Sequence, residues 1–223
     1  MIQVKHLSKS YKRKNTTNVI LKNVNITLFD VGLVYIIGPS GCGKSTLLNI
    51  FEGIDNEYEG DVFINDTNIR KLKGKEKRMF FKDNIGIVSQ ASNLFESLTV
   101  YQNLLLTCYI KGINKSIIDE YLKKYKLEKL KNHKVSTLSG GEKQRISLIR
   151  AIINKPKIIF ADEPTGALDK DNAQILMDEL YELSKTTLVI VVTHNLNLIN
   201  KYKGSIIEIK DKEVEIKENL TIN

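Results

Sequence analysis

The chain has little of what secreted, fibrous or membrane-spanning proteins need. Its 223 residues include two cysteines, Cys42 and Cys108, three prolines and no tryptophan. Two cysteines are too few for a disulfide framework or a zinc site, and thirteen glycines with three prolines exclude collagen-like and low-complexity chains. The longest apolar stretches, such as 188–192, are far shorter than the roughly 18 residues of a membrane span. The N-terminus lacks an apolar run of signal-peptide length. We therefore expect a cytoplasmic chain that reaches a membrane only through a partner.

The charge is moderately basic, with 34 basic and 26 acidic residues and a net charge of +8. The lysines gather at 70–82 and 115–134, where glutamate and aspartate are interleaved with them. A nucleic-acid-binding chain more often has an arginine-rich stripe with stacking aromatic residues. The pattern favours solvated faces, with attraction to an anionic membrane surface as the alternative, and we expect no nucleic-acid partner.

Strand-like and helix-like segments alternate, which predicts an α/β fold with a largely parallel sheet. The strand-like segments are 24–29, 33–38, 61–66, 84–90, 157–162 and 186–194. A closing hairpin is predicted for 205–217. Between residues 91 and 156, periods near 3.6 dominate and strand patterns are absent. We predict a single domain over 1–223, with a helical lobe at about 91–156 inserted between the core segments 1–90 and 157–223.

A glycine-rich loop joins the strand pattern at 33–38 to an apolar helical run at 47–51. Its spacing, G-x-x-x-x-G-K-[ST], lets backbone N–H groups wrap around phosphate oxygens at the start of a helix. The residues predicted to bind phosphate are Gly38, Pro39, Ser40, Gly41, Cys42, Gly43, Lys44, Ser45 and Thr46. The loop alone does not distinguish ATPases, GTPases and nucleotide kinases. A guanine-recognition element is not evident, since 154–157 lacks the final acid of NKxD.

A second helix start suited to anions is predicted at 138–142. Ser139 and Glu142 have the S-x-x-E spacing of a capping box, which alone is typical of an ordinary helix start. The two residues between them, Gly140 and Gly141, weaken the helix but leave its N–H groups open to close approach. Two such helix starts in one chain suggest a nucleotide that is held from two sides.

With these motifs in place, the chain resembles the ATP-binding subunit of an ABC transporter along nearly its whole length. LSGGEKQR at 138–145 resembles the ABC signature, the loop at 38–46 resembles Walker A, and IIFADE at 158–163 resembles Walker B. ALD at 167–169 resembles the D-loop. Gln90 stands at the place of the Q-loop, His194 at that of the switch histidine, and Tyr11 at that of the aromatic residue that stacks on adenine. DEPTGALD at 162–169 is similar to the branch that serves macrolide export, lipoprotein release, antimicrobial-peptide resistance and cell division.

The resemblance implies a P-loop ATPase with a mostly parallel core sheet, an antiparallel β subdomain and an inserted helical lobe. It implies ATP and Mg²⁺ as cofactors, with Ser45, Gln90 and Asp162 as metal ligands. Glu163 would act as the general base or position the attacking water, while Lys44 and His194 contact the γ-phosphate. These roles suit their chemistry, because catalysis of phosphoryl transfer is mostly positioning and electrostatic stabilisation. The second side of the nucleotide would be bound by Ser139, Gly140 and Gly141.

The resemblance also implies two partners. Two copies of the chain would close head-to-tail around two ATP molecules, and an integral membrane permease would hold them at the cytoplasmic side of the cell membrane. The motifs are equally compatible with an ATP-dependent scaffold or regulator of a membrane complex, as in the cell-division pair. The family places the permease contact after Gln90, so Leu94 and Phe95 are predicted to receive the permease. The alternative is that both residues pack the lobe onto the core.

Overall fold

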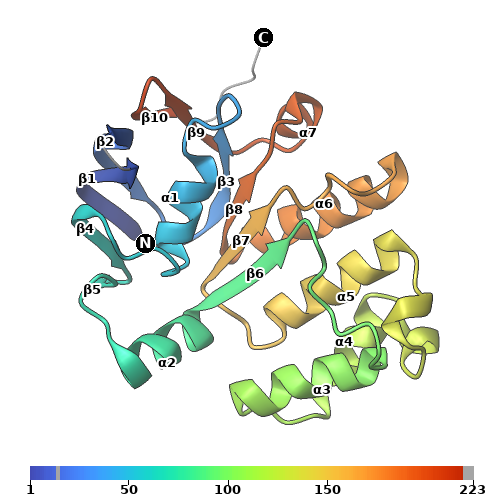
Figure 1. Ribbon diagram of the computed structural model, residues 1–223. Coiled ribbons are helices and arrows are strands. Elements are labelled where there is room, and N and C mark those ends of the chain that lie inside the picture. Colours follow the sequence, from blue (N-terminus) through green and yellow to red (C-terminus); the bar gives the residue numbers. More distant parts are fainter. Residues whose placement is uncertain (14–15, 218–223) are drawn as a thin grey trace.

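The computed structural model describes residues 1–13 and 16–217 and contains two sheets (Figure 1). The larger sheet has the strand order β10-β9-β3-β8-β7-β6. Its neighbours are parallel except for the β9–β10 hairpin. The strands are β3 Gly32–Ile37, β6 Ile85–Ser89, β7 Ile158–Asp162, β8 Leu188–Val192, β9 Ser205–Lys210 and β10 Glu213–Lys217. The predicted α/β fold with a mostly parallel core sheet is confirmed.

Helices cover both faces of this sheet, because its strands contribute alternate residues to two hydrophobic clusters. On β8, Val189 and Val191 enter one cluster, and Ile190 enters the other. Successive side chains of a strand point to opposite faces, so a continuous apolar run is what a strand buried on both faces requires. Helix α1 packs on the second cluster, and five helices, α3 to α7, lie on the first. The helices are α1 Lys44–Phe51, α3 Val100–Lys111, α4 Ile117–Lys124, α5 Gly140–Ile152, α6 Lys170–Ser184 and α7 Leu196–Lys201.

The smaller sheet is antiparallel, with the order β2-β1-β4-β5, and it packs against α1 in the second cluster. Its strands are β1 Ile2–Arg13, β2 Thr16–Leu28, β4 Glu59–Ile64 and β5 Thr67–Asn68. The sequence pattern predicts no strand at 2–13. The alternation of Ile2 and Val4 is broken there, since His6 has a positive φ of 52° and the register of β1 shifts on both of its neighbours.

The segment 91–156, all of which the structure describes, contains no strand. Helix α3 begins with a capping box between Thr99 and Gln102 and ends at Gly112, which has a φ of 71°. Two short 3₁₀ helices, η1 Glu128–Leu130 and η2 Val135–Thr137, lead to α5. Helix α5 contacts β6, α3 and α6, so this segment is packed onto the core sheet.

In the chain, helix α2, Gly74–Asn84, follows β5 of the smaller sheet and precedes β6 of the larger sheet. None of its residues is buried. Its Phe80 and Phe81 are partly buried against the second cluster, and the ring of Phe81 covers Gly53 after α1. Among the helices of residues 1–13 and 16–217, none is both long enough and apolar enough to cross a membrane.

Candidate active site

The phosphate loop connects the end of β3 to the first residue of α1. Gly38, Gly41 and Gly43 have φ angles of 147°, 76° and 115°, which side chains with a Cβ rarely adopt. A Cβ on Gly38 would lie 2.5 Å from the carbonyl oxygen of Ile209. Lys44 Nζ donates to the carbonyl oxygens of Gly38 and Pro39 at 2.9 and 3.0 Å. The ammonium group is therefore held over the loop, at the place where the loop would bind phosphate oxygens.

Two further predicted residues follow the carboxyl ends of β7 and β8, which are parallel neighbours in the sheet. Glu163 follows β7 with a positive φ of 44°, and its N–H donates to the carbonyl oxygen of Val192 at 2.9 Å. Non-glycine residues seldom take this conformation, and strained residues gather at functional sites. His194 Nδ1 lies 2.9 Å from Oε1 of Glu163. The sheet thus brings Glu163 and His194, the predicted Walker B glutamate and switch histidine, into direct contact.

Asp162 and Glu163 are adjacent in the chain but face different neighbours. Burial raises the pKa of Asp162, the negative charge of Glu163 adds to this, and Lys44 opposes it. Asp162 is thus electrostatically coupled to the phosphate-loop lysine, whereas Glu163 contacts His194. This division suits one carboxylate for a metal and one for the attacking water.

Gln90 reaches this group of residues from the end of β6. Its side chain lies against Gly166, in the turn that follows β7. A Cβ added to Gly166 would lie 2.9 Å from Nε2 of Gln90 and 3.4 Å from the carbonyl oxygen of Glu163. The buried Gln144 of α5 donates to the carbonyl oxygen of Ser89, just before Gln90, at 2.8 Å. Gln90 therefore lies close to the turn after β7, and the residue before it is hydrogen-bonded to α5, the helix that begins within the predicted signature.

The residues present fit a magnesium site that the nucleotide completes. Among residues 1–13 and 16–217, no group of three or more carboxylate, histidine or cysteine side chains could hold a metal by itself. Mg²⁺ is usually held by one or two carboxylates together with phosphate oxygens and water. Asp162, near Lys44, would supply a carboxylate, and Ser45 and Gln90 would supply neutral oxygens.

The signature residues lie elsewhere on the surface of the same chain. Ser139 caps α5, accepting from the N–H of Glu142 at 3.3 Å, while the Glu142 carboxylate accepts from the Ser139 N–H at 2.8 Å. Ser139 and Gly140 are exposed. Gly141 is buried against Asn172, near the start of α6 (Figure 1). The described contacts do not join the signature to the phosphate loop, so one chain does not complete the predicted two-sided site.

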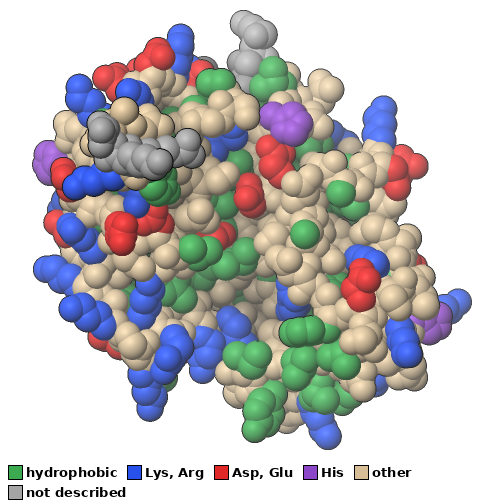
Figure 2. All heavy atoms as spheres, viewed as in Figure 1, with side chains coloured by type: hydrophobic (Ala, Val, Ile, Leu, Met, Phe, Trp, Pro, Cys, Tyr) green, Lys and Arg blue, Asp and Glu red, His purple; other side chains and the backbone are tan. Residues whose placement is uncertain are grey.

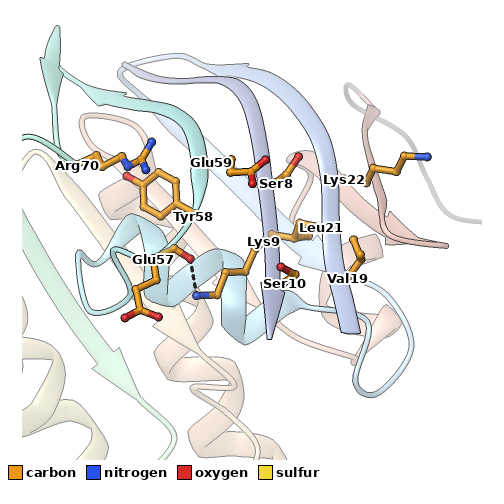
Figure 3. Close-up of a pocket in the computed structure, with 10 residues that line it drawn as sticks. All are labelled: Ser8, Lys9, Ser10, Val19, Leu21, Lys22, Glu57, Tyr58, Glu59 and Arg70. Carbon is orange, nitrogen blue, oxygen red and sulfur yellow. Dashed lines mark hydrogen bonds between the residues drawn. The ribbon is translucent and has the colours of Figure 1, made fainter. Parts of the chain in front are cut away.

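Tyr11 lies on β1 of the antiparallel sheet and has contacts with Asp55 and Lys9. Its hydroxyl donates to Oδ2 of Asp55 at 3.1 Å, and the ammonium group of Lys9 lies 4.6 Å from its ring centroid. Lys9 is only 3% exposed and is paired with Asp55 at 2.8 Å. Figure 3 shows Lys9 crossing from β1 to donate to the carbonyl oxygen of Glu57, beside a hollow of about 500 Å³. The ring is thus held near the C-terminal end of β1, in the antiparallel sheet whose Ile20 lies against Gly43.

A second hollow, which we call the α2–α3 groove, lies between α2, β6, α3 and α5. It has a volume of about 340 Å³ and is lined by Glu52, Phe81, Ile87, Ile110, Lys111 and Arg150 among others. The guanidinium group of Arg150 donates to the carbonyl oxygens of Ser92 and Asn93. Of the two residues predicted to receive the permease, Leu94 is buried in the first cluster, whereas Phe95 is 60% exposed.

Several residues that support the site are not evident from the sequence. Lys9, Gln144, Arg150 and Asn172 each act through a partner that is distant in the chain. A pattern of neighbouring residues cannot reveal such contacts. The sequence offers one signal for Lys9, which is its place at a strand position whose side chain faces inward. A lysine is buried at such a position only when it is paired.

The fold and the site geometry together define a P-loop nucleotide-binding domain, and comparison with known proteins specifies its family. The model of the ABC transporter family matches residues 21–166. The chain is 39% identical to the ABC transporter ATP-binding protein MJ0796 of Methanocaldococcus jannaschii, over 99% of this chain and 97% of that protein. A dimeric structure of MJ0796 bound to ADP and Pi superposes with a TM-score of 0.87 and 36% identity, over 100% of both chains.

Two further relatives have names that state a function. The lipoprotein-releasing system protein LolD of Pseudoalteromonas translucida is 36% identical, over 98% of this chain and 97% of its own length. The bacitracin export protein BceA of Halalkalibacterium halodurans is 36% identical, over 96% of this chain and 87% of its own length. The chain therefore belongs to the ABC transporter family, as an ABC ATPase. The predicted resemblance to its lipoprotein-release and antimicrobial-peptide branch is confirmed.

Proposed function

We propose that two copies of this chain close head-to-tail around two ATP molecules and use their hydrolysis to drive a membrane permease. The observation that carries the proposal is the separation of Ser139 and Gly140, which are exposed, from the phosphate loop of their own chain. In a two-fold pair, the phosphate loop of each copy faces the signature residues of the other. Each copy then supplies one half of each of two equivalent sites. The dimeric structure of the relative MJ0796 supports this arrangement.

Within each site, the chain's own residues would divide the chemistry. Lys44 and the loop N–H groups hold the phosphates, and Tyr11 stacks on the adenine ring. Ser45, Gln90 and Asp162 would hold Mg²⁺, which neutralises phosphate charge when bound. Glu163 positions the attacking water and accepts its proton, while His194, in contact with Glu163 at 2.9 Å, faces the γ-phosphate. The helix start at Ser139, Gly140 and Gly141 adds N–H donors from the partner copy.

Two variants separate nucleotide binding from closure. Lys44→Ala should weaken ATP binding to the isolated chain by about 10- to 150-fold, because a charge-assisted hydrogen bond contributes roughly 1.5–3 kcal/mol. Ser139→Arg should leave that binding unchanged and prevent ATP-dependent dimerisation, because its side chain fills the space facing the partner's nucleotide. Equal loss of ATP binding in both variants, measured by calorimetry on the single chain, would contradict the two-sided site.

We further propose that the permease inserts an apolar helix into the α2–α3 groove. The groove lies beside Ser92 and Asn93, which come soon after Gln90. Their carbonyl oxygens accept hydrogen bonds from Arg150, which lines the groove. Exposed apolar side chains surround its α3 side, with Tyr109 at 87% and Ile110 at 66%. Residues 91–156 would then act as a helical lobe that moves with the nucleotide state. Docking there would hold the chain at the cytoplasmic side of the cell membrane.

A charge at Phe95, two residues after Asn93 and outside the lining of the groove, tests whether the docking surface extends along this segment. Phe95→Asp should leave basal ATP hydrolysis of the isolated chain near normal while capture of the co-expressed permease in detergent falls. The matched control is Phe29→Asp, at a phenylalanine that is 71% exposed in the turn after β2. Unchanged capture by Phe95→Asp, or equal loss with Phe29→Asp, would remove Phe95 from the interface. A loss of basal hydrolysis would instead assign Phe95 to the packing of the chain.

A further inference from the structure

Helix α2 presents one face that is basic and one that holds it on the core. Residues at i, i+3, i+4 and i+7 of a helix share a face, which places Lys75, Arg78, Met79 and Lys82 together. The inner face is anchored by other contacts. Phe80 and Phe81 pack on the second cluster, and Asn154, after α5, donates to the carbonyl oxygen of Lys82 at 3.0 Å. The orientation of α2 is therefore fixed, and its basic face is turned to solvent.

The positive charge of this face and of residues 70–73, which lead into α2, is not neutralised by the chain's own side chains; we call the two together the basic face. Residues 70–84 contain seven basic and two acidic side chains, a net charge of +5 within a chain of net charge +8. Lys82 Nζ lies 3.5 Å from Oδ1 of Asp83, and Lys77 Nζ donates to Oδ1 of Asn56 at 2.8 Å. Among the described residues, the structure gives no side-chain partner for four exposed residues, Lys71, Lys73, Lys75 and Arg78. Met79, in the middle of the face, is 46% exposed.

Helix α2, which carries the basic face, borders the α2–α3 groove with its inner face. Phe81 of α2 lines one side of the groove, and Ile110 and Lys111 of α3 line the other. Figure 2 shows Lys and Arg side chains gathered where Figure 1 draws α2, and hydrophobic side chains beside them over α3. A permease helix in the groove would bring the basic face toward the membrane that holds the permease.

We propose that this basic face binds the anionic phospholipid headgroups of that membrane. Basic residues near an anionic surface each add attraction, and an exposed apolar side chain among them suits the boundary between headgroups and acyl chains. The placement of the face toward the membrane depends on the proposed docking groove. The affinity for anionic lipid does not, because it belongs to the isolated chain.

Flotation of the isolated chain with lipid vesicles tests the proposal. The chain should bind vesicles of equal parts phosphatidylglycerol and phosphatidylcholine, should not bind phosphatidylcholine alone, and should be released by salt. Replacing Lys73, Lys75 and Arg78 with glutamine should lower the partition coefficient by about 100-fold, at about fivefold for each charge. The charge-preserving variant with Lys73→Arg, Lys75→Arg and Arg78→Lys should bind as the parent does, with ATP binding as the check that each variant is folded.

A matched triple variant makes the same change in net charge elsewhere. Lys115, Lys123 and Lys129 are exposed around α4 and η1, and their replacement with glutamine should leave vesicle binding within about threefold of the parent. Equal loss in both triple variants, or no preference for phosphatidylglycerol, would overturn the proposal. Tighter binding to duplex DNA than to vesicles, lost in the α2 variant, would assign the face to nucleic acid instead. A failure of permease docking would leave these lipid measurements unaffected.

Discussion

Glu52 follows the last residue of α1 and lines the α2–α3 groove with its carboxyl group partly buried. Burial raises its pKa from 4.5 to about 7, and the negative charge of Asp162 contributes. The folded chain therefore keeps this proton at pH values where the unfolded chain has lost it. The contribution of Glu52 to stability is most favourable below about pH 4.5, falls as the pH rises to about 7, and is constant above that.

Glu52→Gln should consequently stabilise the protein in a pH-dependent way. At about pH 8 we expect the free energy of unfolding to rise by about 1–2 kcal/mol, a value reduced for the partial exposure of the carboxyl group. The gain should shrink toward zero as the pH falls to about 4.5, because both states are then protonated. Urea unfolding at several pH values measures it. Glu59→Gln, at an exposed position of β4, is the control, and a gain for Glu52→Gln that is independent of pH would contradict the assignment.

At the scale of elements, helices α5 and α6 meet at a contact that leaves no space for a side chain. A Cβ on Gly141 would lie 2.2 Å from Oδ1 of Asn172. Asn172 cannot move away freely, because its N–H and side-chain amide both donate to the carboxylate of Asp169, at 2.8 and 2.7 Å. Asp169, which ends the predicted D-loop, caps α6. The second signature glycine thus lets the signature helix pack directly on the helix that the D-loop begins.

Gly141→Ala should therefore destabilise the chain by about 1–3 kcal/mol through overpacking. Adding Asn172→Ala in the same chain should recover part of that loss relative to Asn172→Ala alone, since the clash is removed. A double-mutant cycle by thermal or urea unfolding measures the coupling. Gly140→Ala is the control, because its Cβ would meet only Leu168, at 4.0 Å. Equal destabilisation by Gly140→Ala would mean that helix-start effects, and not the contact with Asn172, set the cost.

The elements also show what sequence patterns can predict. Continuous apolar runs such as 188–192 predict the parallel core strands, because strands buried on both faces need no polar positions. Strand β1 was missed because His6 interrupts its alternation and Lys9 is buried through an ion pair. Helix α2 has no buried residue and so gives no apolar stripe. The motif residues of the candidate site are predictable because their spacing is local, whereas the contact of Gly141 with Asn172 depends on two segments that only the fold brings together.

At the scale of the whole molecule, one chain holds two half-sites that face different ways. The phosphate loop, Asp162, Glu163 and His194 gather at the carboxyl ends of the parallel strands, while Ser139 is exposed beside the start of α6. Association is therefore required before the predicted nucleotide contacts are complete. In the proposed function, hydrolysis would then reopen the pair, and a permease in the α2–α3 groove would respond to this cycle of closure and opening.

The central claim is that ATP closes two copies of this chain and that Glu163 is needed to reopen them. Glu163→Gln keeps the size of the side chain but cannot accept the proton of the attacking water. ATP binding should be retained, turnover should fall by at least about 100-fold, and ATP with Mg²⁺ should convert the variant to a dimer in size-exclusion chromatography with light scattering. Adding Ser139→Arg to the same chain should return it to a monomer. A Glu163→Gln variant that stays monomeric with ATP and Mg²⁺, or that hydrolyses ATP at the parent rate, would contradict the account.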